Sequence, residues 1–344
     1  FRRVLFRSAL LALLERNPLR LARAAEHAYA QIHYSADGGV QEDYGYVFHG
    51  RIPYAGGYGA GFADTTSLFF HLLDGTPWAA SGEKRGLVEQ FLLEHAQWFL
   101  ENGRMDLLIQ GRAYRHRQPP RAARLLEAVL CLTRTDTDRH GRLVAAAARM
   151  LQGGLPVSLE LAGTADRLSG LDQVRLEGFR YWYSAEMGAF KGNGFHVGLR
   201  QFSERMQDYE YMTQLGEDGW NLAYGFANLL RTDRRGDWYD DRGNLLESLD
   251  FEYLPATTTR IGAHPENPLM PRVGNTGYSL NFGTSPLAGG TGLESGGVAG
   301  FLLEPVHGDF TARKSLHFFP DGYWALGSAI NSSAGLVESR PVVT

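Results

Sequence analysis

The sequence predicts an α+β protein in which an all-helical region precedes antiparallel β structure. Up to about residue 155, apolar residues recur at three- and four-residue spacings, the period of a helix with one buried face. From about Gly170, short apolar or aromatic segments alternate with Gly, Asn, Asp and Pro, which is typical of antiparallel strands and turns. The 344 residues, 44% of them hydrophobic, suffice for one large or two ordinary domains. We expect a helical domain at 1–169 and a β domain at 170–344.

The helical period is found in the segments 8–31, 64–73, 83–101, 120–133 and 139–151. The first residues, FRRVLFRSALLALLER, imitate a signal peptide, but their apolar run is short and passes straight into charged residues. We therefore expect an amphipathic helix at the start of a truncated chain. No run reaches the roughly 18 apolar residues of a membrane span.

The expected strands lie in the segments FRYWYSAEM, GFHVGLRQF, SLNFG, GFLLEPV and SLHFF. His196, His307 and His317 fall in such segments, and we expect them to be hydrogen-bonded structural residues. The aromatic residues of these strands are expected to pack mainly in the core.

Charge and motifs exclude several classes of function. The formal net charge is −4, from 34 basic and 38 acidic residues, so the chain as a whole favours neither nucleic acid nor an anionic membrane. Cys131 is the single cysteine, which excludes a disulfide framework and a cysteine-rich metal site. H-E-x-x-H and G-x-S-x-G are absent, and GGYGAG lacks the remainder of a phosphate-binding motif. We expect no metal and no other cofactor.

The most informative segment begins at Asp37 and reads DGGVQEDYGYVFHGRIPYAGGYG. It places His49 nine residues before Tyr58, and glycines at 56, 57 and 59 bracket the tyrosine. Residues without Cβ let the backbone turn sharply, so a polymer is expected to approach the phenol closely. The alternative is an aromatic surface loop with one hydrogen-bonded histidine.

Five segments in order resemble polysaccharide lyase family 8, which includes hyaluronate, chondroitin AC and xanthan lyases. The loop above resembles the family's DG-x-x-x-x-H and Y-x-G-x-YG patterns, and GRAYRHR from Gly111 resembles its arginine segment. FSERMQDYEYM with GEDGWNLAYG, then YLPATTT, then ARKSLHFFPDGYWALGSAINSS resemble three later family segments. The resemblance implies an incomplete α/α toroid followed by an antiparallel β-sandwich.

The resemblance also implies a chemistry, the β-elimination of a uronic acid linked at C4. Tyr58 would be the base and also the acid, and Arg112, 54 positions later, would stabilise its phenolate. His49 would hydrogen-bond the substrate carboxylate or, alternatively, receive the C5 proton. Glu210 would hold Arg112 or His49 in place. Substrate contacts would come from Arg115, His116, Arg117 and Trp220, the last by stacking from a loop on a sugar ring.

Departures from the family pattern leave alternatives open. The family's asparagine, about fifty residues before the histidine, falls before Phe1, and its second arginine is replaced by His116. The chain is thus also compatible with a catalytically silent carbohydrate-binding remnant. A glycoside hydrolase would need two carboxyl groups across a cleft, for which Asp43 and Glu210 are available.

The resemblance sets the expected partners and location. We expect an anionic polysaccharide as substrate, no nucleic acid, no membrane, a monomer, and a secreted or periplasmic protein. The polymer, the cleavage mode and the sulfation preference stay open.

Overall fold

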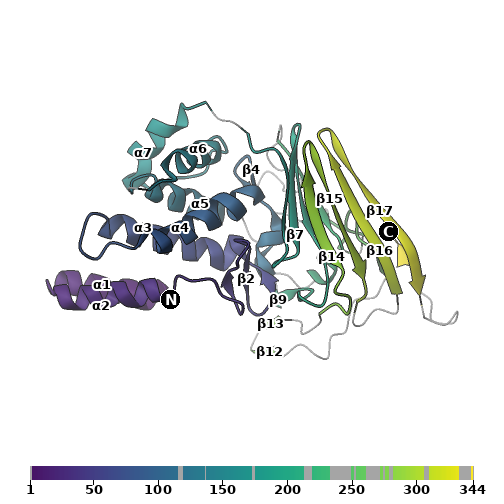
Figure 1. Ribbon diagram of the computed structural model, residues 1–344, viewed down its shortest axis with the longest axis horizontal. Coiled ribbons are helices and arrows are strands. Elements are labelled where there is room, and N and C mark those ends of the chain that lie inside the picture. The colour runs from purple at the N-terminus through teal and green to yellow at the C-terminus, as the bar shows by residue number, and fades with distance from the viewer. Residues whose placement is uncertain are drawn as a thin grey trace.

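Helices occupy one side of the molecule and sheets the other (Figure 1). The computed structural model describes residues 2–114, 119–135, 137–172, 175–212, 219–232, 249–251, 253–260, 272–273, 276–278, 282–305, 310–332 and 342–343. The predicted order, helical region first and antiparallel β structure second, is confirmed.

The helical side contains the α-helices of the described residues and two small ladders. The helices are α1 (Arg2–Leu14), α2 (Pro18–Ala30), α3 (Ala60–Leu73), α4 (Gly82–Gln90), α5 (Pro119–Leu132), α6 (His140–Leu151) and α7 (Leu159–Ser169). The ladders are β1 (Gly39–Val40), β2 (Tyr46–Phe48) and β3 (Ile52–Pro53), and β4 (Leu100–Glu101) with β5 (Arg104–Met105).

The prediction of one helix over 8–31 is wrong, because the helix is interrupted between α1 and α2. Arg16 adopts a left-handed backbone with φ 50°, and Asn17 then caps α2, its Oδ1 accepting the Arg20 N–H at 3.0 Å. Pro18 takes the first helical position, where its missing N–H costs nothing. Apolar periodicity continues across this break and conceals it.

The segment 83–101 also departs from the expected single helix. α4 gives way to a π-helical turn at Phe91–His95 and a 3-10 turn at Ala96–Phe99, and β4 follows. This irregular stretch is almost entirely buried, so tertiary packing outweighs the local helical preference. α7 lies beyond the segments in which a helix was expected.

The β side is built from antiparallel sheets. Its strands are β6 (Gly178–Trp182), β7 (Met187–Gly192), β8 (Phe195–Arg200), β9 (Glu210–Met212), β10 (Ala227–Arg231), β11 (Thr259–Arg260), β12 (Arg272–Val273), β13 (Thr276–Tyr278), β14 (Ala288–Leu293), β15 (Gly296–Leu303), β16 (Phe310–Phe319), β17 (Gly322–Ser332) and β18 (Val342–Val343). The two larger sheets have the orders β10-β8-β7-β6 and β14-β15-β16-β17, and β12-β13-β9 form a smaller one.

The sheet β10-β8-β7-β6 is the middle layer of the fold. Its strands β7 and β8 are buried on both faces. One face packs Phe190 against Phe318 of the outer sheet, with ring centroids 5.3 Å apart. The opposite face meets the helical side, where Lys191 Nζ donates to the Leu100 carbonyl at 2.7 Å. Helices, middle sheet and outer sheet thus form three layers (Figure 1).

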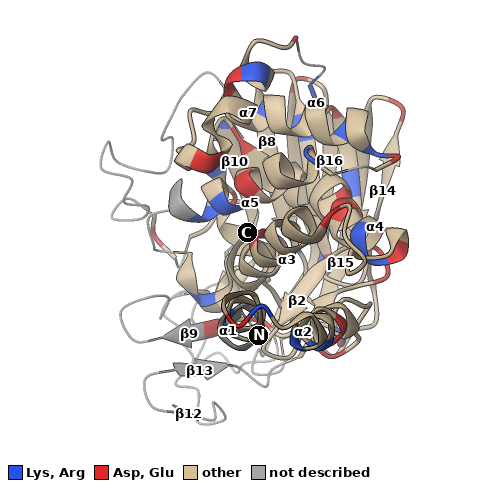
Figure 2. Ribbon diagram, turned by 90° about the vertical axis from the view of Figure 1, so that its left-hand side faces the viewer, with Lys and Arg blue, Asp and Glu red and all other residues tan. Residues whose placement is uncertain are grey.

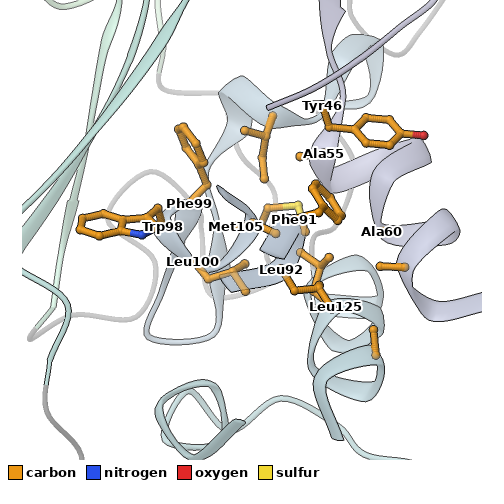
Figure 3. Packing of buried hydrophobic residues seen from close by; sticks show 14 of the residues in the cluster. Tyr46, Ala55, Ala60, Phe91, Leu92, Trp98, Phe99, Leu100, Met105 and Leu125 are labelled. Atoms are coloured by element: carbon orange, nitrogen blue, oxygen red, sulfur yellow. The ribbon is translucent and has the colours of Figure 1, made fainter. Parts of the chain in front are cut away.

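The largest hydrophobic cluster joins the helical region to the middle sheet. Phe91, Leu92 and Met105 pack with Leu125 of α5 in its centre (Figure 3). Trp182 and Met187, from the β side, belong to the same cluster. The two regions therefore share one core, which sets their relative position.

Charged residues of both signs are interspersed over the helices that face the viewer in Figure 2. This distribution agrees with the small net charge of the sequence. Within the described part of the chain, every helix is too short or too polar to cross a membrane.

Candidate active site

Four side chains from separate segments meet where the helical region contacts β9. They are His49, Tyr58, Arg112 and Glu210, four of the residues that the sequence nominates. His49 Nδ1 lies 2.6 Å from Glu210 Oε1, and Arg112 Nη2 lies 3.4 Å from the Tyr58 hydroxyl. Arg112 Nη1 also donates to Glu210 Oε1. The contacts form a chain from the phenol through the guanidinium to the carboxylate and the imidazole.

His49 lies at the corner of the hairpin between β2 and β3. Its backbone is left-handed, with φ 53°, and Gly50 follows with φ 85°, as tight hairpins require. A Cβ on Gly50 would lie 2.2 Å from Gln207 Oε1, the atom that accepts the Arg51 N–H at 2.6 Å. The hairpin is therefore held against the segment that leads to Glu210, and this places the imidazole beside the carboxylate.

Tyr58 lies in a π-helical turn (Ala55–Gly59) that runs directly into α3. Its ring packs against Phe48 at a tilt of 31°, with centroids 4.4 Å apart, and meets His49 edge-on at 4.8 Å. The side chain is 39% exposed. The phenol is thus fixed by aromatic contacts on one side and open to solvent on the other.

The flanking glycines do not serve the purpose expected of them. A Cβ on Gly56 would lie 2.2 Å from Met105 Sδ, and one on Gly57 would lie 2.4 Å from the Tyr54 ring. At Gly59 the space is taken by Phe91 and Tyr46. These glycines admit the protein's own side chains. The phenol is open to solvent only through the exposed part of its own ring.

Arg112 lies in a 3-10 turn (Gly111–Ala113). Gly111 has φ 56°, and a Cβ there would lie 2.1 Å from the Tyr54 ring, so glycine is required on both counts. Burial on its own would lower the pKa of Arg112, but Tyr54 and Glu210 beside it outweigh burial and raise that pKa. The guanidinium is a permanent cation at the phenol.

Glu210 is fully buried and assigns the proton on His49. Nδ1 of His49 lies 2.6 Å from Glu210 Oε1, which only accepts hydrogen bonds, and 3.1 Å from Arg112 Nη1, which only donates them. The shorter contact, to the carboxylate, favours the tautomer with the proton on Nδ1. In the neutral imidazole, Nε2 then carries the lone pair and is the ring nitrogen available to a ligand. The His49 side chain is 27% exposed.

Two further residues at the site were not nominated from the sequence. Tyr54 is buried, meets Tyr58 edge-on with centroids 4.9 Å apart, and has its pKa raised by burial, which keeps it neutral. It is the first tyrosine of the Y-x-G-x-YG pattern, so a signal for it was present. Arg121 on α5 is a second cation near Tyr54 and Arg112, and burial lowers its pKa. Only the fold brings Arg121 to the site, since it belongs to no recognised motif.

The remaining nominated residues have other outcomes. Arg115, His116 and Arg117 lie outside the described residues. Trp220 lies in a 3-10 turn (Gly219–Asn221), is 4% exposed, and packs edge-on against Tyr224. Hydrophobic packing covers the ring, so stacking on a sugar would require Trp220 to be uncovered. His196 is a hydrogen-bonded core residue, as predicted.

A cavity of about 300 Å³ lies elsewhere, between the helical region and β7. Its lining includes Gln97, Glu101, Arg149, Arg175, Lys191 and Thr232, and none of the four site residues. Within the described ranges, no group of three His, Cys, Asp or Glu side chains is placed to hold a metal ion.

Comparison with known proteins supports the resemblance. Residues 6–143 match "Polysaccharide lyase family 8, N terminal alpha-helical domain", and residues 177–344 match "Polysaccharide lyase family 8, super-sandwich domain". A xanthan lyase of Bacillus sp. (strain GL1) is 25% identical over 327 residues, 87% of this chain and 32% of that protein. A hyaluronate lyase of Thermasporomyces composti is 22% identical over 97% of this chain and 44% of that protein. The chain thus spans less than half the length of these relatives.

Solved structures show the same fold. Paenibacillus xanthan lyase superposes with a TM-score of 0.81 at 23% identity, over 95% of this chain and 32% of that one. The Streptomyces coelicolor A3 chondroitin AC lyase, in complex with chondroitin sulphate, superposes with a TM-score of 0.78 at 20% identity, over 97% of this chain and 47% of that one. The predicted order, an incomplete α/α toroid followed by an antiparallel β-sandwich, is confirmed. The chain belongs to polysaccharide lyase family 8.

Proposed function

We propose that this chain forms the catalytic part of a lyase that cleaves a uronate-containing polysaccharide by β-elimination. The observation that carries the proposal is the meeting of His49, Tyr58, Arg112 and Glu210 at one place. Similarity to a xanthan lyase and a hyaluronate lyase supports the substrate class. Since such polymers are outside cells, we also propose a secreted or periplasmic location.

In the proposed reaction Tyr58 removes the C5 proton of the uronate. The electron pair of the C5–H bond forms the C4–C5 double bond, the C4–O bond breaks, and the leaving oxygen takes a proton from the same phenol. Arg112 supports the phenolate form, because its Nη2 lies 3.4 Å from the oxygen. With its proton on Nδ1, neutral His49 can receive a proton at Nε2 but cannot donate to the uronate carboxylate, a contact that requires the imidazolium. Glu210 holds both Arg112 and His49.

The site geometry argues against a glycoside hydrolase with Asp43 and Glu210 as its carboxyl pair. Asp43 Oδ2 accepts the Ser184 N–H at 2.9 Å, and its Oδ1 accepts the Gly45 N–H at 3.0 Å. Glu210 is fully buried beneath Arg112 and His49. Both carboxylates are engaged within the protein, whereas a hydrolase needs them facing the glycosidic bond.

Ultraviolet absorbance of the product tests the proposal, because only elimination leaves a conjugated unsaturated uronate. Xanthan, hyaluronan and chondroitin are incubated with the chain, with Tyr58→Phe, and with Tyr183→Phe, which alters an exposed tyrosine outside the site. We expect absorbance to rise for one of the polymers with the unmodified chain and with Tyr183→Phe. New reducing ends without absorbance would indicate a hydrolase, and binding without cleavage would indicate a silent remnant.

A further inference from the structure

A second carboxylate–histidine pair lies deep in the boundary between the helical region and the middle sheet. Asp106 Oδ2 is 2.8 Å from His196 Nε2, and both side chains are fully buried. Burial lowers the pKa of His196, although Asp106 acts in the opposite direction. The ring is therefore neutral, and its Nε2–H donates to the carboxylate.

The fold makes room for this pair at Gly198. Side chains at 196 and 198 of β8 point to the same face, and a Cβ on Gly198 would lie 2.0 Å from Asp106 Oδ2. Only glycine lets the carboxylate reach the strand. Val197, between them, faces the outer sheet in another hydrophobic cluster.

Asp106 also organises the backbone that leads to Arg112. Its Oδ1 accepts the Leu108 N–H at 2.9 Å and so caps the 3-10 turn at Leu107–Ile109. The Gln110 side chain donates to the Asp106 carbonyl at 3.3 Å, and the Ala113 N–H donates to the Gln110 carbonyl at 3.2 Å. Arg112 thus lies six residues beyond Asp106, on a continuously hydrogen-bonded stretch.

His196 belongs to the strand that leads to Glu210, fourteen residues further along the chain. Arg200, at the end of that strand, donates to the Gln207 carbonyl at 2.6 Å. The segments that supply Arg112 and Glu210 are therefore tied twice. One tie is the Arg112–Glu210 ion pair itself, and the other is the buried Asp106–His196 pair.

We propose that Asp106 and His196 are positioning residues that set the distance of Arg112 from Tyr58 and Glu210. The proposal rests on the proposed function. Neither residue touches substrate, and both act through the backbone of the arginine segment. Loss of the tie lets that segment shift, and a displacement of about 1 Å at a catalytic group can cost about a hundredfold in rate.

The test compares His196→Leu, which has similar bulk but no donor, with His196→Gln, whose amide can still donate to Asp106. Val197→Ala is the matched control, since it damages the same strand from its other face. For His196→Leu we expect kcat to fall about 10- to 100-fold with KM nearly unchanged. The acid-side limb of the pH–rate profile should move to higher pH, because a phenolate farther from Arg112 is less stabilised.

His196→Gln should restore most of kcat and return the limb to its original position. Val197→Ala should lower thermal stability and leave both the limb and kcat unchanged. The titratable groups around the Tyr58 phenol are His49, Tyr46, Tyr54 and Arg112, with Glu210 behind them, and these variants alter none of their side chains. Identical profiles for His196→Leu and Val197→Ala would overturn the proposal.

A readout without turnover separates this proposal from the proposed function. With 3-fluorotyrosine at position 58, the fluorine resonance follows titration of the phenol. A higher midpoint in His196→Leu than in Val197→Ala supports positioning even where no polymer is cleaved, and equal midpoints refute it. If His196→Leu yields no folded protein, His196→Asn replaces it, since its amide is too short to reach Asp106.

Discussion

The hydroxyl of Tyr58 lies 3.4 Å from Nη2 of Arg112, while Nη1 of the same guanidinium donates to Glu210. One planar cation thus joins an exposed phenol to a fully buried carboxylate. The arrangement requires two directed donors on one rigid group, which a lysine lacks. It gives the proposed base a partner that the protein itself holds in place.

Replacing Tyr58 by Phe removes one oxygen and retains the ring that packs against Phe48. If the phenol transfers the proton, turnover should fall by about 10²–10⁴-fold. Polymer affinity should change little. Elimination rates and equilibrium binding are measured in parallel, and near-normal turnover would move the base role to His49.

Arg112→Lys should also lower turnover, although the positive charge is kept. An ammonium cannot donate to the Tyr58 hydroxyl and to Glu210 in the same geometry. We expect kcat to fall at least about tenfold and the pH–rate profile to move to higher pH. The control Tyr183→Phe should leave the profile where it is. Unchanged kinetics would separate Arg112 from the chemistry.

Glu210→Gln preserves the shape of the side chain and removes its charge. The guanidinium then loses its buried counter-ion, and His49 faces a neutral amide oxygen in place of a charged acceptor. We expect a fall of about 10- to 100-fold in kcat. The double variant with Arg112→Lys should cost much less than the sum of the two single effects, because both disturb one network. Glu204→Gln, an exposed control, should behave as the unmodified chain.

Gly111→Ala should destabilise the fold by about 2–4 kcal/mol, from a left-handed backbone and from overlap with the Tyr54 ring. Gly141→Ala is the matched control. That glycine is within α6, and its Cβ would meet no atom within 4 Å, so alanine should stabilise by about 0.5–1 kcal/mol. Urea unfolding of both variants gives the comparison, and equal stabilities would contradict the packing argument.

His95 should make the protein sensitive to acid. Burial lowers its pKa to about 3, and neither ring nitrogen has a hydrogen-bond partner among the described residues. An unfolded histidine titrates near pH 6.5, so between that value and about pH 3 the unfolded chain binds the extra proton. The free energy of unfolding then falls by about 1.4 kcal/mol per pH unit as pH decreases, and above about pH 6.5 the contribution vanishes.

His95→Leu removes the titratable group and places an apolar side chain among Phe91, Phe99 and Trp182. The difference in free energy of unfolding between His95→Leu and the unmodified chain should be about 2 kcal/mol more favourable to the variant at pH 5 than at pH 7.5. His27→Gln, on the exposed side of α2, should show no such difference. Equal changes at both pH values would mean that His95 can be protonated in the folded protein.

The sequence predicts what is encoded locally or by intervals within motifs. The intervals between His49, Tyr58 and Arg112 were legible because they match the segments of polysaccharide lyase family 8. The end of α4 could not be predicted from the sequence, because the core around the π-helical turn at Phe91–His95 imposes that turn. The strand-like segment around His196 indicated a hydrogen-bonded structural residue, but no local pattern connects it to Asp106, ninety residues earlier.

The glycines around Tyr58 illustrate the same limit. Their clustering correctly indicated close approach, yet it could not say what approaches. Met105 and Tyr54 occupy the space, and only the folded structure identifies them. The packing over Trp220 could not be predicted for a related reason, since a loop-like sequence context carries no information on what covers a ring.

His49 and Glu210 are 161 residues apart in the chain, and Arg112 and Glu210 are 98 apart. Contacts this distant close long loops, which makes them slow to form during folding. The helical segments can collapse with His49, Tyr58 and Arg112 already near one another, but the carboxylate arrives only when β9 docks. Recovery of activity after dilution from denaturant would therefore lag behind recovery of helical circular dichroism. The length of this lag would measure the rate of the last step of assembly.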